Sequence, residues 1–421
     1  MLGLLDGLPL AIAQAAAFLQ ESGYDFKTYI ECYEDQWKEL MKSRDWEGAP
    51  LQDYPDRSVW TTWAISYSAI RERHVPAANL LLLWAFLDSK DLWYSLFAAA
   101  CSNSKTTARC LSEWIGDFAI NEVEFAKAIQ LLRNYSLIED VEGRGSYATH
   151  LVVHRWAYYF QGEDSRAQLA RLAVMVTGWA VPDRSFLDYS LQHRLLSHAQ
   201  VCSHWVLTDE MRLSSLSHER VSTEIHVSDE LVAILDSIHL LGSLYNHLGK
   251  LDEADQMYER ALQGKEKAFG AEHTSTLDTI NNLGILYANR GKLAEAEQMY
   301  ERALHGYEKA LGTDNAATYI PALNAMRGLG CLFHRQADFL KARIMYSKAL
   351  AGYEKVSGPD DSRSQNLRNN IRALDADAET EALKTAEEPV SNSRGETSHL
   401  GVGRASSVSR RYKLLKKLGL R

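Results

Sequence analysis

Leu241-Gly242-Ser243-Leu244-Tyr245 begins a pattern that returns twice along the chain. It recurs 42 residues later as Leu283-Gly284-Ile285-Leu286-Tyr287, and 46 residues after that as Leu329-Gly330-Cys331-Leu332-Phe333. Four further positions recur with the same shifts, namely Ala254, Tyr258, Ala261 and Leu262, then Ala296, Tyr300, Ala303 and Leu304, then Ala342, Tyr346, Ala349 and Leu350. Small residues at fixed positions let paired helices approach closely, and large residues fill the space between pairs. The pattern therefore predicts three helical hairpins and a capping helix over residues 230–372, with the four extra residues of the third copy in a loop around Thr313–Pro321.

This order of small and aromatic residues is that of tetratricopeptide repeats. Within that class, the copies resemble those of kinesin light chains, which have 42-residue units. The match is closest over Gly270–Gly284 and Gly291–Lys309. Thr274 departs from the subclass, which usually has a proline there. The resemblance implies a superhelix of paired α-helices in which the first helix of each pair lines a concave surface.

Aligning the copies assigns the outward positions of each first helix, and we predict that they form a peptide-binding groove. These positions are Asp236, His239, Ser243, Asn246 and His247; Asp278, Asn281, Ile285, Ala288 and Asn289; and Asn324, Arg327, Cys331, His334 and Arg335. Asn amides both donate and accept hydrogen bonds, so they can bind a peptide backbone of any sequence. The arginines favour an acidic segment, for which the chain's own Asp375–Glu388 is a candidate. The alternative is that these are ordinary solvated side chains.

The first half of the chain is predicted to be helical up to one β-hairpin. Apolar residues at helical spacing predict helices over Leu8–Gln20, Phe26–Lys42, Trp60–Glu72 and from Pro76, with a loop at Glu47–Arg57. Three more helices are predicted to precede two short strands around a Gly-rich turn, at Asp91–Cys101, Lys105–Ile115, Glu122–Asn134, Leu137–Val141 and Tyr147–His150. Three helices followed by a hairpin are the outline of a winged helix.

Two motifs in this half resemble the end of an NB-ARC module, the nucleotide switch of apoptotic and immune-receptor ATPases. Gly7-Leu8-Pro9-Leu10-Ala11 matches the GLPLA motif of its helical subdomain, and Thr149–Trp156 resembles the methionine-histidine motif of its winged helix. Thr149 replaces the methionine and Leu151 the usual aspartate, so the second motif is degraded. The resemblance implies an adenine contact for Pro9 and a β-phosphate contact for His150. An NB-ARC module, a winged helix and such repeats, in this order, resemble receptor-like proteins abundant in filamentous fungi.

Several chemical sites are not supported by the sequence. No GxxxxGK[ST] run exists to hold phosphates, so we expect no ATP hydrolysis by this chain. ADP or ATP would bind only if a preceding phosphate-binding half existed. A zinc-protease interpretation of His150 and His154 fails because Leu151 stands where the general base belongs. We therefore predict a protein that is not an enzyme, with no metal and no cofactor.

Composition and charge narrow the class further. The chain has 421 residues and a net charge of −9, which argues against binding to nucleic acid through its overall charge. Its five cysteines are scattered, which argues against a disulfide framework. The predicted third helix of the winged helix has too few Lys and Arg residues to favour DNA binding. No run approaches the roughly 18 apolar residues of a membrane helix. We expect a cytoplasmic protein without membrane insertion, although the basic tail would also suit nuclear import.

The tail has blocks of opposite charge. Asp375–Glu388 carries six acids and one lysine, whereas His399–Arg421 carries seven Lys or Arg residues and no acid. Such blocks are typical of disordered segments.

The fold class is therefore mainly α, and five parts are expected. They are a helical NB-ARC remnant (1–75), a winged helix (76–160), a helical connector (161–229), the repeats (230–372) and a disordered tail (373–421). The leading function is a protein-interaction scaffold or sensor arm from a receptor-like ATPase lineage, able to oligomerise in a longer form. Two alternatives remain: a nucleotide-dependent switch lacking its P-loop half, and a kinesin-light-chain-type cargo adaptor.

Overall fold

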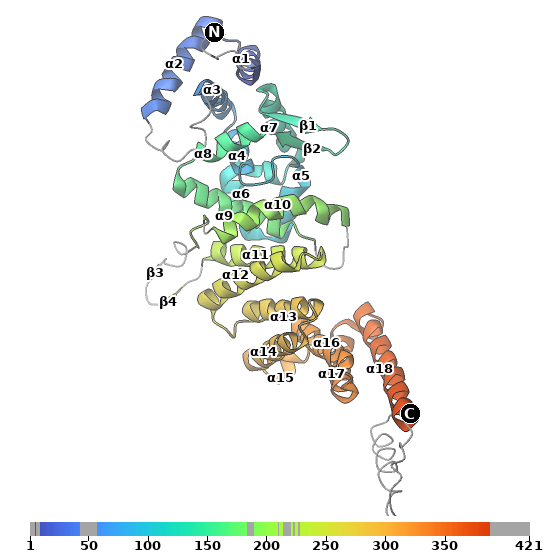
Figure 1. The fold of residues 1–421 in the computed structure, drawn as a ribbon. Helices are drawn as coiled ribbons and strands as arrows, with labels where there is room; N and C mark the ends of the chain where they lie inside the picture. The colour runs from blue at the N-terminus through green and yellow to red at the C-terminus, as the bar shows by residue number, and fades with distance from the viewer. Residues whose placement is uncertain are drawn as a thin grey trace, which may run out of the picture. The chain divides into compact units, whose positions relative to one another are not determined.

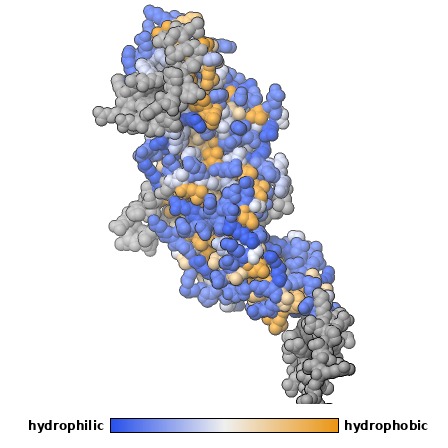
Figure 2. Space-filling view, viewed as in Figure 1, coloured by the Kyte–Doolittle hydropathy of each residue, from blue (hydrophilic) through white to orange (hydrophobic). Residues whose placement is uncertain are grey.

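The computed structural model describes Leu5 and residues 9–42, 57–182, 189–208, 210–213, 220–221, 224–225 and 228–387. The fold is mainly α-helical (Figure 1). The chain divides into two compact units, Met1–Ala271 and Glu272–Arg421. Within the described residues, no helix is long and apolar enough to cross a membrane. The face in Figure 2 is largely hydrophilic, with hydrophobic residues in small groups.

The first three helices agree closely with the sequence prediction. They are α1 (Pro9–Ser22), α2 (Phe26–Lys42) and α3 (Arg57–Arg73). Phe18 of α1 packs against Tyr29 and Tyr135, with ring centroids 5.5 and 6.1 Å apart. These aromatic contacts attach the first helices to the following part of the unit. The loop predicted at Glu47–Arg57 lies outside the described residues, apart from Arg57, which begins α3.

The next part contains helices followed by the predicted hairpin. Its elements are α4 (Val75–Trp84), α5 (Tyr94–Asn103), α6 (Lys105–Ile115), η1 (Gly116–Ala119), α7 (Glu122–Asn134), β1 (Ile138–Val141) and β2 (Ser146–Thr149). The strands are antiparallel, with Ile138 opposite Thr149. The helix predicted from Asp91 begins only at Tyr94, because Leu92 exchanges backbone hydrogen bonds of 2.9 and 2.8 Å with Tyr147. That bridge adds one extended residue to the edge of the hairpin.

The predicted connector is integrated into the first unit. It contains α9 (Glu163–Trp179) and α10 (Tyr189–Leu207), whereas α8 (Leu151–Tyr159) precedes it within the predicted winged helix. Trp179 donates a 3.1 Å hydrogen bond to the Ala233 carbonyl, and Arg171 pairs with Glu230 at 3.0 Å. These contacts hold the first repeat in the same unit as α9, so the unit boundary falls inside the predicted repeat region. A two-residue ladder, β3 (Arg220–Val221) with β4 (Glu224–Ile225), corrects the expectation of a single hairpin.

Three helix pairs form the repeats. They are α11 (Asp229–His247) with α12 (Leu251–Phe269), α13 (Thr274–Asn289) with α14 (Leu293–Leu311), and α16 (Ile320–Arg335) with α17 (Phe339–Ser357). The Leu-Gly position needs glycine because a Cβ at Gly284 would lie 2.8 Å from Cδ1 of Tyr300. The equivalent Cβ at Gly242 would lie equally close to Tyr258. The loop predicted at Thr313–Pro321 holds the short α15 (Thr313–Ala316).

The second unit ends in a long helix, α18 (Ser362–Glu387). Residues 373–387, predicted to begin a disordered tail, continue this helix. Leu367 and Leu374 are buried in the core of the second unit, and Asp375 pairs with Arg343 of α17. The charge pattern was misleading because it gave no weight to these apolar residues at helical spacing. The remainder of the acidic block and the basic block lie outside the described residues.

Candidate functional site

The first predicted groove position of each repeat is engaged within its own repeat. Tyr307 of α14 donates a 2.6 Å hydrogen bond to the Asp278 carboxylate, and Tyr353 of α17 donates one of the same length to Asn324. In the first repeat, the buried Lys265 ammonium pairs with Asp236 at 2.8 Å. The contact recurs because the end of the second helix returns alongside the start of the first. Asp236, Asp278 and Asn324 therefore connect the two helices of a repeat.

The next position along the first helix is different in the second unit. Asn281 is 4% exposed, and its Oδ1 atom has no hydrogen-bond partner within the described residues. Arg327 occupies the same position one repeat later and is half-buried. Its guanidinium has no ion pair or hydrogen bond within the part of the chain that the structure describes. Buried polar groups normally find partners, so the Asn281 oxygen is an exception, and Arg327 places a second polar group without a partner among the described residues at the equivalent position.

The C-terminal groove positions contact the neighbouring first helix. Arg335 of α16 donates a 3.2 Å hydrogen bond to the Ala288 carbonyl of α13. His334 lies 2.9 Å from the Asp377 carboxylate of α18, measured from Nε2 to Oδ2. Ile285 is half-buried against the core, whereas Asn289 is exposed. The face formed by α13, α16 and α18 thus has polar contacts at one end.

The groove positions of the first repeat belong to the first unit. The His239 ring packs edge-on against Tyr258, with ring centroids 5.4 Å apart. Asn246 and His247 are half-buried at the end of α11. These side chains, together with Asp236, have interactions within the protein. The predicted positions are therefore divided between the two units.

The predicted capping helix is α18, but sequence analysis did not recognise it as a fourth first helix. Asn369-Asn370-Ile371 in α18 repeats Asn281-Asn282-Leu283 at a shift of 88 residues, which is the sum of the two repeat shifts, 42 and 46. Arg372 stands where the other copies have glycine, which concealed the match. No second helix follows with the usual turn, since α18 continues to Glu387. The helix therefore extends the face of α13 and α16 and supplies Asp377 to it.

The predicted nucleotide contacts lie on the surface of the first unit. Pro9 is exposed at the start of α1, and His150 is exposed directly before α8. The His150 ring accepts a 3.3 Å hydrogen bond from the Val152 amide, so it caps that helix. His154 lies inside α8, with its Nε2 3.0 Å from the carbonyls of Trp84 and Leu87. The two imidazoles therefore make separate contacts, and no group of potential metal ligands occurs among the described residues.

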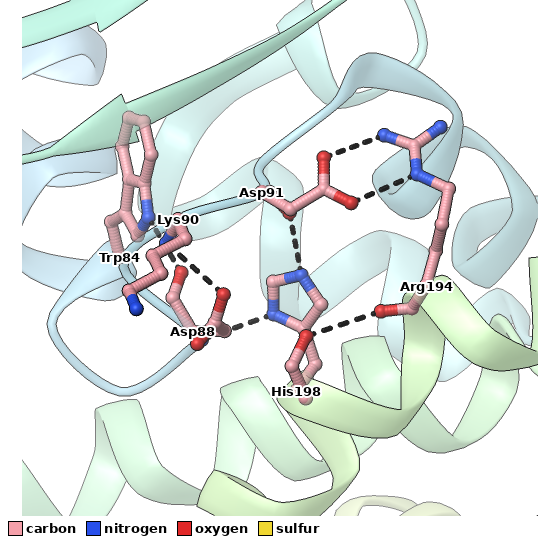
Figure 3. A network of polar contacts seen from close by, with 7 residues as sticks. Trp84, Asp88, Lys90, Asp91, Arg194 and His198 are labelled. Atoms are coloured by element: carbon pink, nitrogen blue, oxygen red, sulfur yellow. Dashed lines mark hydrogen bonds and ion pairs between the residues drawn. The ribbon is translucent and has the colours of Figure 1, made fainter. Parts of the chain in front are cut away.

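A buried polar network joins α10 to the turn after α4 (Figure 3). Arg194 binds the Asp91 carboxylate through two hydrogen bonds of 2.9 and 2.8 Å. His198 accepts from the Asp88 amide at 3.1 Å and lies 2.7 Å from the Asp91 carbonyl. Burial would raise the pKa of Asp91, but the hydrogen bonds and charge of Arg194 hold it below its usual value. Burial lowers the pKa of His198. Arg194, Asp91 and His198 all have protein partners in this network, which is therefore structural.

Comparison with known proteins agrees with the repeats. The tetratricopeptide repeat family model matches residues 233–309. An NLR-like protein of Hyaloscypha variabilis, named as a nucleotide-binding leucine-rich repeat-like protein, is 26% identical over 286 residues. The match covers 65% of this chain but only 24% of that relative. The crystal structure of BtubC (BKLC) from P. vanneervenii covers 58% of this chain and all of its own, at 17% identity and a TM-score of 0.33. The chain is thus a mainly α-helical protein that contains tetratricopeptide repeats and is similar to part of an NLR-like protein.

Proposed function

We propose that this chain is a non-enzymatic interaction scaffold or sensor arm, and that it binds protein segments on the face formed by α13, α16 and α18. The observation that carries the proposal is the pair of unsatisfied groups at Asn281 and Arg327. Binding would require the Asn281 side chain to turn outward, so that its carbonyl accepts a backbone N–H from the bound segment. The segment would also place a carboxylate or carbonyl against the Arg327 guanidinium.

Charge favours an acidic segment. Arg327 and Arg335 both lie on α16 and face a ligand from the same helix. On the neighbouring α18, Asp375 and Asp377 are already paired with Arg343 and His334. The acidic block that we considered as an internal ligand therefore contacts α16 and α17 through its first residues, as part of α18. Because the interface is small, we expect dissociation constants on the order of micromolar for short peptides.

A random-peptide display library selected on the full chain tests the proposal. We expect enrichment of sequences containing Asp or Glu, and loss of their binding in Arg327→Glu. Lys348→Glu on the exposed face of α17 makes the same charge change and serves as the matched control. Asn281→Ala should also weaken binding while leaving the melting temperature unchanged or higher, because it removes an unsatisfied buried carbonyl. Equal binding by the parent chain and Arg327→Glu would refute the site.

The name of the relative favours a second candidate, a nucleotide-dependent switch of the receptor-like ATPase lineage. The chain spans about a quarter of that relative, which leaves room for a phosphate-binding half elsewhere in a longer protein. In that case ADP or ATP would contact Pro9 and His150, and the longer form could oligomerise. Calorimetry with ADP separates the two candidates, since micromolar binding by this chain that is lost in His150→Ala would favour the switch. A cargo-adaptor role of the kinesin-light-chain type would use the same peptide-binding face.

A further inference from the structure

A second candidate surface lies between the second helices of the last two repeats. A hollow of about 280 Å³ opens there between α14 and α17, with α16 as its floor. Four apolar side chains line it, together with His305: they are Leu304, Leu329, Phe333 and Met345. None of these side chains belongs to the predicted peptide-binding positions, so this surface is separate from the one proposed above.

Two carboxylates border the hollow on the α14 side. Glu301 and Glu308 are seven residues apart, which places them on one face of the helix at a separation of about 10.5 Å. Neither carboxylate has an ion pair or side-chain hydrogen bond among the residues that the structure describes. On the other side, Lys341 pairs with Asp338 at 3.3 Å and lies over the Phe333 ring. The hollow therefore has an apolar floor beside two carboxylates that form no ion pair within the described residues.

The chain itself contains a segment with the complementary pattern. Arg410-Arg411-Tyr412-Lys413-Leu414-Leu415-Lys416-Lys417-Leu418 combines five basic residues with three leucines. On a helical register, Arg410, Leu414 and Lys417 fall at i, i+4 and i+7, on one face. The two charges of that face are then about 10.5 Å apart, with a leucine between them. This spacing equals that of Glu301 and Glu308 on α14.

The connecting chain is long enough for this contact. Residues 388–409 separate α18 from the basic segment, and a random coil of 22 residues would have a root-mean-square span of about 26 Å. The 19 residues of α17 extend about 28 Å, so the linker covers distances of the size of a helix in this unit. Such a tether gives an effective concentration on the order of millimolar. Even a segment with weak intrinsic affinity would then be mostly bound.

We propose that the basic C-terminal segment, residues 410–418, docks in the hollow between α14 and α17 of its own chain. Leu414 enters the apolar floor, and Arg410 and Lys417 pair with Glu301 and Glu308. The docked segment covers the hollow until a competing basic, leucine-containing segment displaces it.

The test uses a fluorescent peptide of residues 404–421 and a chain that ends at Glu387. We expect the truncated chain to bind the peptide with a dissociation constant of about 100 μM or tighter. The full chain should bind it at least tenfold more weakly, because its own segment competes. The double variant Glu301→Lys/Glu308→Lys of the truncated chain should lose at least tenfold in affinity. The matched control Glu295→Lys/Asp314→Lys makes the same charge change at exposed positions outside the hollow and should lose little.

A charge swap between the peptide and α14 provides a second test. A peptide carrying Arg410→Glu and Lys417→Glu should fail on the parent truncated chain and recover binding on Glu301→Lys/Glu308→Lys. Equal affinities for the full and truncated chains would overturn the proposal, as would a failed recovery. A tail-dependent dimer in analytical ultracentrifugation would also overturn it, because the segment would then dock on a second copy.

Discussion

Tyr307 and Tyr353 provide a matched comparison within one unit. Both side chains are fully buried, both occupy the same position in the second helix of their repeats, and both donate a 2.6 Å hydrogen bond to the first helix. The acceptors differ, since Asp278 offers a carboxylate and Asn324 an amide. Substitution by phenylalanine removes one oxygen and retains each ring. The ring contact of Tyr307 with Tyr319 and that of Tyr353 with Arg363 are therefore kept.

The acceptor determines the expected loss of stability. A hydrogen bond to a charged group contributes about 1.5–3 kcal/mol, against about 0.5–1.5 kcal/mol for a neutral pair. The acceptor of Tyr307 is the Asp278 carboxylate, whereas the acceptor of Tyr353 is the Asn324 amide. We therefore expect Tyr307→Phe to lower the free energy of unfolding of the second unit by about 2 kcal/mol. Tyr353→Phe should lower it by about 1 kcal/mol.

Native-state hydrogen exchange read by mass spectrometry measures both losses. The method assigns the change to the second unit, which contains no tryptophan and so cannot be followed by intrinsic tryptophan fluorescence. In an Asp278→Asn background, the loss caused by Tyr307→Phe should fall to that caused by Tyr353→Phe. Equal losses in the parent background, or a larger loss for Tyr353→Phe, would refute the claim that the acceptor charge sets the energy.

Two further predictions concern packing and pH. Ala296→Leu should destabilise the second unit by roughly 1–3 kcal/mol, because Ala296 is fully buried in the core. Ala294→Leu on the exposed side of the same helix is the control and should cost little. Hydrogen exchange of the second unit measures both losses of stability. Ala288, which was predicted to lie on the open groove, cannot serve as the control because it packs against the same core. Burial lowers the pKa of His198 below the value near 6.5 that it has in the unfolded chain. At low pH the unfolded chain therefore binds one more proton than the folded chain. The free energy of unfolding should fall as the pH drops below about 6.5. Tryptophan-detected melting between pH 7.5 and 5.5 should show a smaller dependence in His198→Gln, and an unchanged slope would contradict this account.

The repeats could be predicted from the sequence because their contacts are local and recur. Gly284 faces Tyr300 across one turn between two adjacent helices, and the same pair of residue types appears in each copy. Such contacts leave a pattern of fixed spacing that needs no knowledge of distant residues. The helices α2 and α7 were predicted at their observed bounds for a similar reason, since each has an apolar stripe of helical period.

Contacts between distant residues left no such pattern. Asp91 and Arg194 are 103 residues apart, and neither position stands out in the sequence. Trp179 of α9 donates a hydrogen bond to a backbone carbonyl of the first repeat. Because every residue type has such a carbonyl, the sequence pattern gives no sign of this contact. The connector was therefore predicted as a separate part, although its helices complete the first unit. The capping helix was predicted, but it was not recognised as a fourth first helix because Arg372 replaces the glycine on which the alignment depended.

The predicted groove positions also show what repeat alignment leaves undetermined. Alignment places a side chain on the first helix but does not say whether the second helix reaches it. Asp278 is reached by Tyr307, whereas Asn281, three residues further, has a buried carbonyl oxygen without a donor. The equivalent residue of the first repeat, His239, packs against Tyr258 instead. One repeat position thus contributes to packing in the first unit and leaves polar groups unsatisfied in the second. This difference, rather than the repeat pattern itself, is why we assign binding to the second unit.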